Sequence, residues 1–352
     1  ESSLYIAWLA NNDLTYEKKH ELNFGIDAGF LNNRINFTFD IYTRRNYDLI
    51  GATNTMGIGG ESTKYGNVAK MKSNGVELSL NTVNIKTKDF TWTTDFIYSH
   101  MHNEVTELNT YNRLYDYISG YGFTMPGYPQ RSLFSIPFAG LNNEGLPTFY
   151  DPDGNITVTG IDMQEYDPER LKFLKYEGPA DPTDVGSLGN IFRYKNLTLN
   201  LFITYSFGNV VRLDPVFSSE YSDLSATPKE FNNRWIKPGD EKFTNIPVIA
   251  SRQQLNNIAY LSRAYQSYNY STARVAKGDF IRMKEISLAY EFPKTLTQPL
   301  HLSNLSLKLQ ATNLFLLYAD KKLNGQDPEF FNAGGVATPM PKQFTLTLKF
   351  GI

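Results

Sequence analysis

Strict alternation of apolar and polar side chains is the feature that most limits how this chain can fold. In residues 197–207 every second side chain is apolar: Leu197, Leu199, Leu201, Ile203, Tyr205 and Phe207. Thr198, Asn200 and Ser206 stand between them. A β-strand turns successive side chains to opposite faces, whereas a helix repeats about every 3.6 residues. The same alternation recurs at 22–30, 35–41, 76–81, 92–98, 285–292, 305–311 and 344–350, and it predicts an all-β fold.

Hydropathy excludes one class of membrane protein and leaves another. Mean hydropathy is −0.39, and no stretch approaches the roughly 20 apolar residues that a membrane-spanning helix needs. A membrane β-barrel fits these values, because its strands alternate between lipid and a polar interior. Aromatic residues flank several predicted turns, as Trp92 and Phe292 do. This placement is typical of the aromatic belts at the two membrane surfaces.

Short and long connections alternate between the predicted strands. The short ones are 31–34, 87–89, 142–145, 195–196 and 293–304, and the long ones are 51–72, 109–130, 151–185, 208–278 and 320–341. Outer-membrane barrels have short periplasmic turns and long extracellular loops, whereas a soluble β-sandwich has no reason to alternate in this way. The sequence therefore predicts an antiparallel meander of transmembrane strands.

The direction of the strands sets their expected number. Strands at 132–141 and before residue 195 would both run towards the short turns, so an upward strand is needed between them, and only 146–150 is available. This gives about eleven transmembrane strands, an odd number, whereas bacterial single-chain barrels have an even number. Open sheet edges are not tolerated in lipid. We therefore expect residues 1–352 to be the C-terminal part of a barrel whose first half lies outside this chain.

Several stretches, in chain order, resemble the SusC/RagA-like TonB-dependent transporters of the outer membrane. They are LTYEK at 14–18 with NFGID at 23–27, GNVA at 66–69 with NGVEL at 74–78, RW at 234–235, GDFIRMK at 278–284 with ISLAY at 286–290, and NLF at 313–315 with GQDPE at 325–329. Tyr16 and Ala69 depart from the family pattern, which has Trp and Gly there. The resemblance covers nearly the whole chain.

The resemblance implies an architecture and a set of partners. It implies a barrel of about 22 strands in the cell outer membrane, surrounded by lipid and closed below by an N-terminal plug. Residues 1–352 would be its second half, without the plug and the first half. A SusD-like surface lipoprotein would cover the extracellular loops, and the TonB complex would act through the N-terminal region. The implied activity is import of oligomeric nutrients, with a glycan as the first expectation and a peptide as the second.

Aromatic residues in the long loops are the candidate substrate-binding residues, because sugar faces stack on aromatic rings. They are Tyr111, Tyr115, Tyr117, Tyr121, Trp235, Tyr265, Tyr268 and Tyr270. The alternative is that these rings pack within their own loops or against the lipoprotein, since aromatic residues are generally enriched at protein interfaces.

Residue patterns for catalysis, metals and nucleic acid are weak. No G-x-S-x-G motif occurs, and His100 and His102 share a strand face without a third ligand. Asp151, Asp153 and Asn155 resemble the start of a calcium loop, but no closing Glu follows, which favours a surface turn. The chain has no Cys, and its net charge of −2 does not indicate a nucleic-acid partner. We predict no catalytic residue, metal or cofactor, and thus a protein that is not an enzyme.

Two other functions fit the same pattern of strands. A passive outer-membrane channel would share the alternation and the loop lengths. A soluble β-rich carbohydrate-binding protein or enzyme would share the alternation alone. A plug and a TonB-binding segment in the gene would separate an active importer from a channel, and fractionation with the outer membrane would separate both from a soluble protein.

Overall fold

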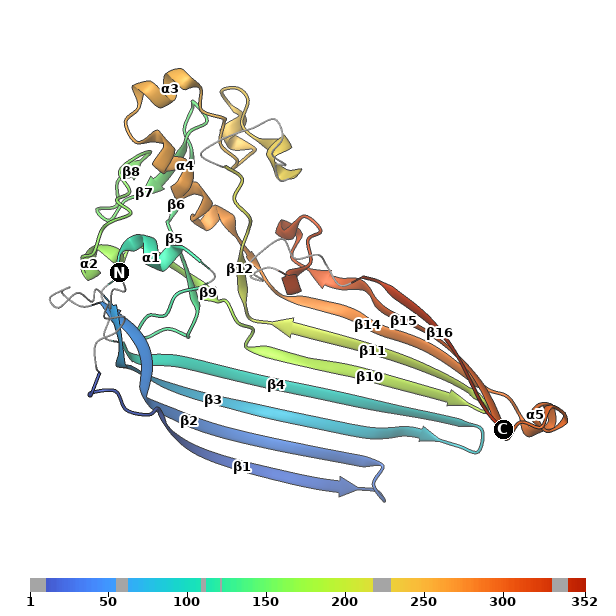
Figure 1. Cartoon of the computed structure of the whole chain (residues 1–352). Coiled ribbons are helices and arrows are strands. Elements are labelled where there is room, and N and C mark those ends of the chain that lie inside the picture. The colour runs from blue at the N-terminus through green and yellow to red at the C-terminus, as the bar shows by residue number, and fades with distance from the viewer. Residues whose placement is uncertain (1–10, 55–62, 109–111, 121, 218–228, 331–340) are drawn as a thin grey trace, which may run out of the picture.

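The computed structural model describes residues 11–54, 63–108, 112–120, 122–217, 229–330 and 341–352. One curved sheet of nine strands dominates it (Figure 1), in the order β1-β2-β3-β4-β10-β11-β14-β15-β16. The strands are β1 Lys18–Phe30, β2 Ile35–Asn54, β3 Thr63–Lys86, β4 Phe90–Leu108, β10 Asp184–Tyr194, β11 Leu197–Phe207, β14 Phe280–Glu291, β15 Asn304–Ala319 and β16 Gln343–Gly351. All neighbours are antiparallel, which confirms the predicted meander.

Two of the expected eleven strands do not lie in this sheet. Residues 132–141 form β5 Ser132–Ser135 and β6 Phe138–Leu141, which pair with β9 Lys175–Pro179 and β7 Pro147–Tyr150 in two small separate sheets. β4 pairs directly with β10 instead. A four-residue strand is only about 13 Å long, too short to cross a bilayer. Strand directions alternate correctly whether no strand or two strands lie between β4 and β10. The prediction of two transmembrane strands at 132–141 and 146–150 was wrong, because this rule does not decide between the two numbers.

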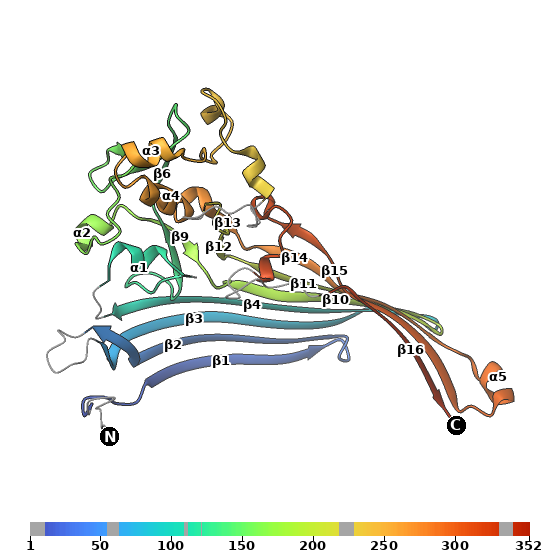
Figure 2. The ribbon, with the colours of Figure 1, turned by 45° about the horizontal axis from the view of Figure 1, so that its top comes forward.

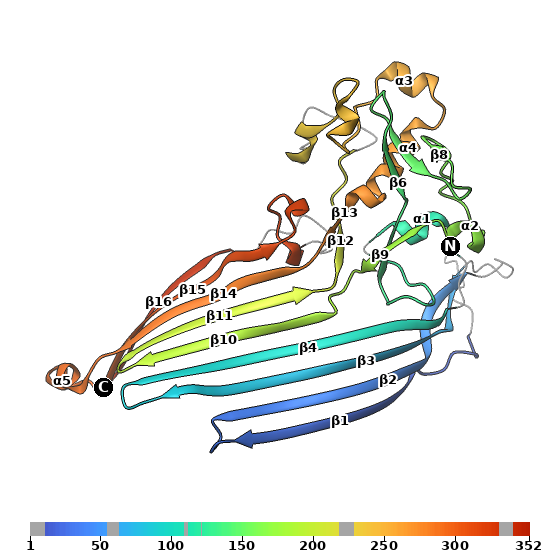
Figure 3. The same ribbon diagram turned by 180° about the vertical axis from the view of Figure 1, so that it is seen from behind.

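The two ends of the sheet differ as expected. Connections 31–34, 87–89 and 195–196 lie at one end, together with the longer turn that holds α5 Lys294–Thr297 (Figure 3). Leu31, Asn32 and Asn33 all have positive φ, a backbone conformation that Asn tolerates better than most residues. Long connections leave the opposite end, the loop end. The short connection expected at 142–145 is a hairpin within these loops and not a turn of the sheet.

The strands differ greatly in length. β10 and β11 have 11 residues each, whereas β2 has 20 and β3 has 24. At about 3.3 Å per residue and a tilt of about 45°, eleven residues cover about 25 Å, the height of the apolar band of an outer-membrane barrel. β2 and β3 therefore continue well beyond this band. The long loop expected at 51–72 is shorter as a result, because β2 reaches Asn54 and β3 begins at Thr63.

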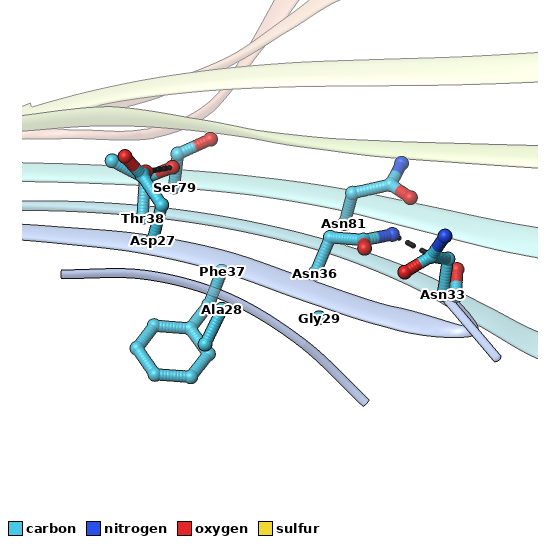
Figure 4. Close-up of a pocket in the computed structure, with 9 residues that line it drawn as sticks. All are labelled: Asp27, Ala28, Gly29, Asn33, Asn36, Phe37, Thr38, Ser79 and Asn81. Atoms are coloured by element: carbon cyan, nitrogen blue, oxygen red, sulfur yellow. Dashed lines mark hydrogen bonds between the residues drawn. The ribbon is translucent and has the colours of Figure 1, made fainter. Parts of the chain in front are cut away.

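The sheet has one apolar face and one polar face. Apolar side chains that point away from the interior are 43–76% exposed on the two outermost strands, β1 and β16. They are Leu22, Phe24, Ile26, Phe30, Phe344, Leu346, Leu348 and Phe350. Figure 4 shows Phe37 on this face, while Asp27, Thr38 and Ser79 project towards the later strands of the sheet. A soluble protein rarely exposes so large a continuous apolar surface, whereas lipid covers it in a barrel.

The largest dry core of the described residues lies in the loops and not in the sheet. Residues 112–183 and 208–279, as far as they are described, form a crown over the loop end (Figure 2). Its further elements are α1 Leu114–Ile118, β8 Ile156–Thr157, α2 Pro168–Leu171, β12 Val210–Arg212, α3 Arg252–Asn257, α4 Leu261–Asn269 and β13 Val275–Lys277. Short 3₁₀ helices are η1 Lys229–Asn233, η2 Asp240–Lys242, η3 Thr272–Arg274, η4 Gln298–Leu300, η5 Lys321–Leu323 and η6 Pro328–Phe330.

Leu114, Phe149, Leu261 and Tyr268 are almost fully buried in the core of the crown. Leu114 comes from α1, Phe149 from β7, and Leu261 and Tyr268 from α4, so burial of these side chains joins both loops into one folded unit. Within the described ranges, no helix is long and apolar enough to cross a membrane.

Candidate transport path and mouth pocket

The polar face of β1–β3 forms a hydrated wall. A hollow of about 350 Å³ lies against Asp27, Asn36, Thr38 and Asn81 (Figure 4). Thr38 Oγ1 donates to Asp27 Oδ1 at 2.6 Å, and Asn36 Nδ2 donates to the carbonyl of Asn33 at 2.9 Å. These short polar side chains satisfy one another and still face open space. Such a surface suits water and polar cargo rather than lipid.

Charge is distributed unevenly over this wall. Asp27, Asp40 and Glu77 lie on the polar face of β1–β3, and Asp40 stands directly opposite Glu77. Like charges on opposed residues of two strands repel each other, so this arrangement requires surrounding water. On β15 and β16 the same face has Lys308 and Lys349. Charges of both signs therefore line the polar face, with Arg44 beside Glu21 on β1–β2 and Lys308 beside Glu285 on β14–β15.

A tyrosine packed over a glycine stiffens the wall where the NGVEL stretch lies. Tyr42 is directly opposite Gly75 and is only 6% exposed. A Cβ on Gly75 would lie 2.4 Å from Tyr42 Oη and 2.7 Å from the carbonyl oxygen of His100. The Arg44 guanidinium covers the ring at 3.9 Å, and its Nε lies 3.1 Å from a carboxylate oxygen of Glu21. Only glycine leaves room for this ring.

A second tyrosine packs over a glycine elsewhere in the sheet. Tyr205 is directly opposite Gly186 and reaches across β10, where its Oη donates to the carbonyl of Ile97 at 2.9 Å. A Cβ on Gly186 would lie 2.1 Å from that carbonyl oxygen. The ring thus ties three strands together. Sequence reasoning missed both pairs, because only the register between strands reveals them.

A larger pocket lies where the wall meets the crown. We call it the mouth pocket; its volume is about 650 Å³. The sheet contributes Val185, Gly186, Thr204, Tyr205, Ser206, Phe280 and Lys284. The loops contribute Arg131, Ala180, Asp181, Pro182, Asn209, Gly278, Pro328 and Glu329. This volume lies within the range of small-ligand sites, about 300–1,000 Å³.

Most charged groups of the mouth pocket have partners. Arg131 Nη1 lies 2.5 Å from Asp181 Oδ1. Arg282, buried behind the pocket, pairs with Asp327, and its Nε lies 2.7 Å from Glu329 Oε2. These contacts hold the loop between β15 and β16 against the inner wall. Among the residues that the structure describes, no ion pair joins Lys284 to a carboxylate.

Buried arginines also fasten the crown. Arg274 is 2% exposed, donates to the carbonyl of Asp214 and forms an ion pair with Glu230 at 2.5 Å. Asn324 Nδ2 donates to the other oxygen of Glu230 at 3.4 Å, which connects the last loop to the crown. Burial lowers the pKa of the Arg212 guanidinium to about 10, so this group remains charged at neutral pH.

The predicted binding aromatics fall into three groups. Tyr111 and Tyr121 lie outside the described residues. Trp235, Tyr265 and Tyr268 are buried at 8%, 9% and 1% exposure, and burial raises the pKa of Tyr268 to about 12. Their substrate contacts stay a prediction, and all three side chains are buried in this structure.

The remaining three aromatics, Tyr115, Tyr117 and Tyr270, are half-buried. The rings of Tyr115 and Tyr270 meet edge to face at 5.9 Å. Tyr115 also lines a hollow of about 300 Å³ together with Arg113, Gln164 and Gln266. This ring therefore lies beside open, polar space, as a ring that stacks on a sugar must.

His100 and Asp151, which were considered above as metal ligands, form hydrogen bonds with protein groups instead. His100 Nδ1 lies 2.8 Å from Asp184 Oδ1, which also accepts from Tyr98 Oη at 2.7 Å. Asp151 Oδ1 accepts from the backbone N–H groups of Asp153 and Asn155, and these hydrogen bonds lower the pKa of Asp151. Over the described parts of the chain, no cluster of three or more metal-binding side chains is found.

A curved antiparallel sheet with a lipid-facing apolar surface and a hydrated polar surface is the wall of an outer-membrane β-barrel, and this is the class of protein that the fold and the site define. The chain resembles the SusC/RagA-like TonB-dependent transporters, as its motifs predicted. TonB-dependent receptor SusC of Bacteroides thetaiotaomicron is 28% identical over 96% of this chain and 32% of its own length. TonB-dependent receptor P39 of Formosa agariphila is 26% identical over 94% of this chain and 34% of its own.

Solved structures agree with the fold. The RagAB peptide transporter superposes with a TM-score of 0.74 at 24% identity, over 98% of this chain and 36% of that chain. No family model matches the sequence. The chain spans about a third of the length of the curated relatives it matches.

Proposed function

We propose that the protein containing this chain imports oligomeric nutrients across the outer membrane, with glycans as the first expectation and peptides as the second. The observation that carries the proposal is the two-faced sheet with a pocket of about 650 Å³ at its mouth. The similarity to SusC, and to a structure described as a peptide transporter, supports import. Cargo would be captured among the loops and then pass along the polar wall.

The proposal includes three protein partners. Among the described strands, β1 and β16 each have a single neighbour. Unpaired backbone groups are costly in lipid, so the remaining barrel strands would pair with these edges. A SusD-like surface lipoprotein would cover the crown, where Phe243 and Ile236 are 89% and 67% exposed. The TonB complex would act through an N-terminal region outside this chain.

Within the crown, we propose that Tyr115 contacts cargo. Arg113 and Gln164 stand beside it in the same hollow and can donate hydrogen bonds to sugar hydroxyls or peptide carbonyls. Tyr115→Ala in the full transporter should reduce uptake, while Tyr150→Ala is the matched control, since Tyr150 is 43% exposed and not part of this hollow. Equal uptake by the two variants would remove Tyr115 from the binding site.

The test of the proposed function is uptake by cells with and without TonB. The full-length protein is expressed with its lipoprotein partner, and accumulation of labelled oligosaccharides and peptides is measured. Active import predicts that accumulation stops when TonB is deleted. Accumulation that continues unchanged would establish the passive-channel alternative, and absence of the protein from the outer-membrane fraction would support the soluble one.

A further inference from the structure

Lys284 is the extra residue of a β-bulge. On one side, β11 pairs Ile203 with Met283 and Phe202 with Glu285, so that Lys284 is skipped. On the other side, β15 has two residues, Asn313 and Leu314, opposite Lys284, between the pairs Met283–Phe315 and Glu285–Thr312, so the extra residue there lies on β15. A bulge changes the direction of a side chain relative to the regular alternation. Here the displaced side chain lines the mouth pocket.

Lys284 has no direct ionic partner among the described residues of the pocket, although Arg282 is paired with two carboxylates. Asp181 is engaged by Arg131, and Glu329 is engaged by Arg282. Lys284 is half-buried, and within the described ranges no salt bridge or side-chain hydrogen bond is recorded for it. An ammonium group that has lost part of its water gains most from an anionic acceptor. The absence of a direct ionic partner therefore favours an anionic group of a ligand that reaches the Lys284 ammonium.

We propose that the mouth pocket is a subsite for a carboxylate of the cargo, which forms an ion pair with the Lys284 ammonium. This inference rests on the proposed function. Thr204 and Ser206 add hydroxyl groups to the same lining, and Val185 and Phe280 add apolar surface for the carbon skeleton. The shared chemistry is the carboxylate, which a uronic acid residue or the end of a peptide can supply.

The test uses the purified full-length transporter with its lipoprotein and two pairs of probes. One pair is a peptide with a free C-terminus and its amide; the other is an oligogalacturonate and its methyl ester. Wild type should bind an acidic probe that the subsite recognises about tenfold more tightly than the neutral probe of the same pair. Hydrogen bonds to charged groups are stronger than those between neutral groups. A preference within only one pair identifies the source of the carboxylate.

Variants then assign the preference to one side chain. Lys284→Gln should remove the preference and leave binding of the neutral probes unchanged, whereas Lys284→Arg should keep it. Lys349→Gln is the matched control, because Lys349 lies on the same face of β16 and does not line the pocket. Equal binding of acid and neutral probes by wild type, or equal losses for both probes in Lys284→Gln, would overturn the proposal.

The carboxylate subsite and the proposed import can be refuted independently of each other. Carboxylate preference at Lys284 without TonB-dependent uptake would leave the subsite in place and refute import. Uptake of both neutral and acidic oligomers without any preference would support import and refute the subsite.

Discussion

The packing of Tyr42 against Gly75 makes a quantitative prediction. In Gly75→Ala the new Cβ would lie 2.4 Å from Tyr42 Oη, 2.5 Å from Cζ and 2.7 Å from the carbonyl oxygen of His100. The ring cannot move aside easily, because Arg44 covers it, and the carbonyl belongs to the next strand. Overpacking of this kind costs about 1–3 kcal/mol. The loss of glycine flexibility in the unfolded chain returns about 0.4–1 kcal/mol, so we expect a net loss of about 1–2 kcal/mol.

The matched control is Gly189→Ala. A Cβ on Gly189 would meet its nearest neighbour, Phe202 Cδ2, at 3.5 Å, an ordinary contact. This variant should be as stable as wild type or slightly more stable. The assay is urea unfolding of the purified full-length protein in detergent, followed by heat-dependent gel mobility. A Gly75→Ala midpoint equal to that of Gly189→Ala would refute the reasoning.

A second measurement isolates the ring. In the Tyr42→Ala background the alanine at position 75 meets no phenol, so the effect of Gly75→Ala should be smaller than in wild type. The two free-energy changes of unfolding would then fail to add, as expected for residues in contact. Strict additivity would show that the cost comes from the His100 carbonyl alone.

Three further outcomes are expected from the loops and the wall. Glu230→Gln leaves Arg274 buried without its counter-charge, so the crown should lose about 3–5 kcal/mol and be cleaved faster by protease. Asp153→Asn removes only an exposed carboxylate partner of Arg170, so it should change the cleavage rate little. Tyr205→Phe keeps the ring but loses its hydrogen bond, and it should lower the unfolding free energy by about 0.5–1.5 kcal/mol in the urea assay. The pKa of Asp151 is lowered, so its turn should be unchanged from neutral pH down to about 4 and weaken only below that, which amide hydrogen exchange would detect; weakening already at pH 6 would contradict this sign.

Alternation was enough to predict most of the wall but not the crown. Alternation predicts eight of the nine strands of the sheet, because lipid on one face and water on the other force a period of two. The ninth, β10, was predicted from the short turn that follows it. The short strands at 132–135 and 147–150 are instead buried on both faces inside the crown, except at Tyr150. Strands at 132–141 and 146–150 were assigned to the barrel from strand direction, and that rule does not distinguish a barrel strand from a buried loop strand.

The mouth pocket could be predicted only in part. Its lining runs from Arg131 to Glu329, and no spacing in the sequence brings these positions together. One signal was present: Lys284 and Glu285 are consecutive charged residues between Met283 and Ile286, where alternation requires one. Such a break in the period of two is typical of a bulge. The ion pairs that engage Asp181 and Glu329, and so leave Lys284 without a direct ionic partner, result from loop packing and have no local sequence signature.

The outermost strands, β1 and β16, limit how these residues can be handled in the laboratory. On the outer edge of each strand, the backbone donors and acceptors have no hydrogen-bonded partner among the described strands. This edge lies next to exposed apolar side chains. Copies of a fragment confined to residues 18–351 would satisfy these backbone groups by stacking on one another, as exposed strands do in aggregates. Conductance or binding measured on such refolded material would report these aggregates, so every experiment proposed above requires the full-length protein.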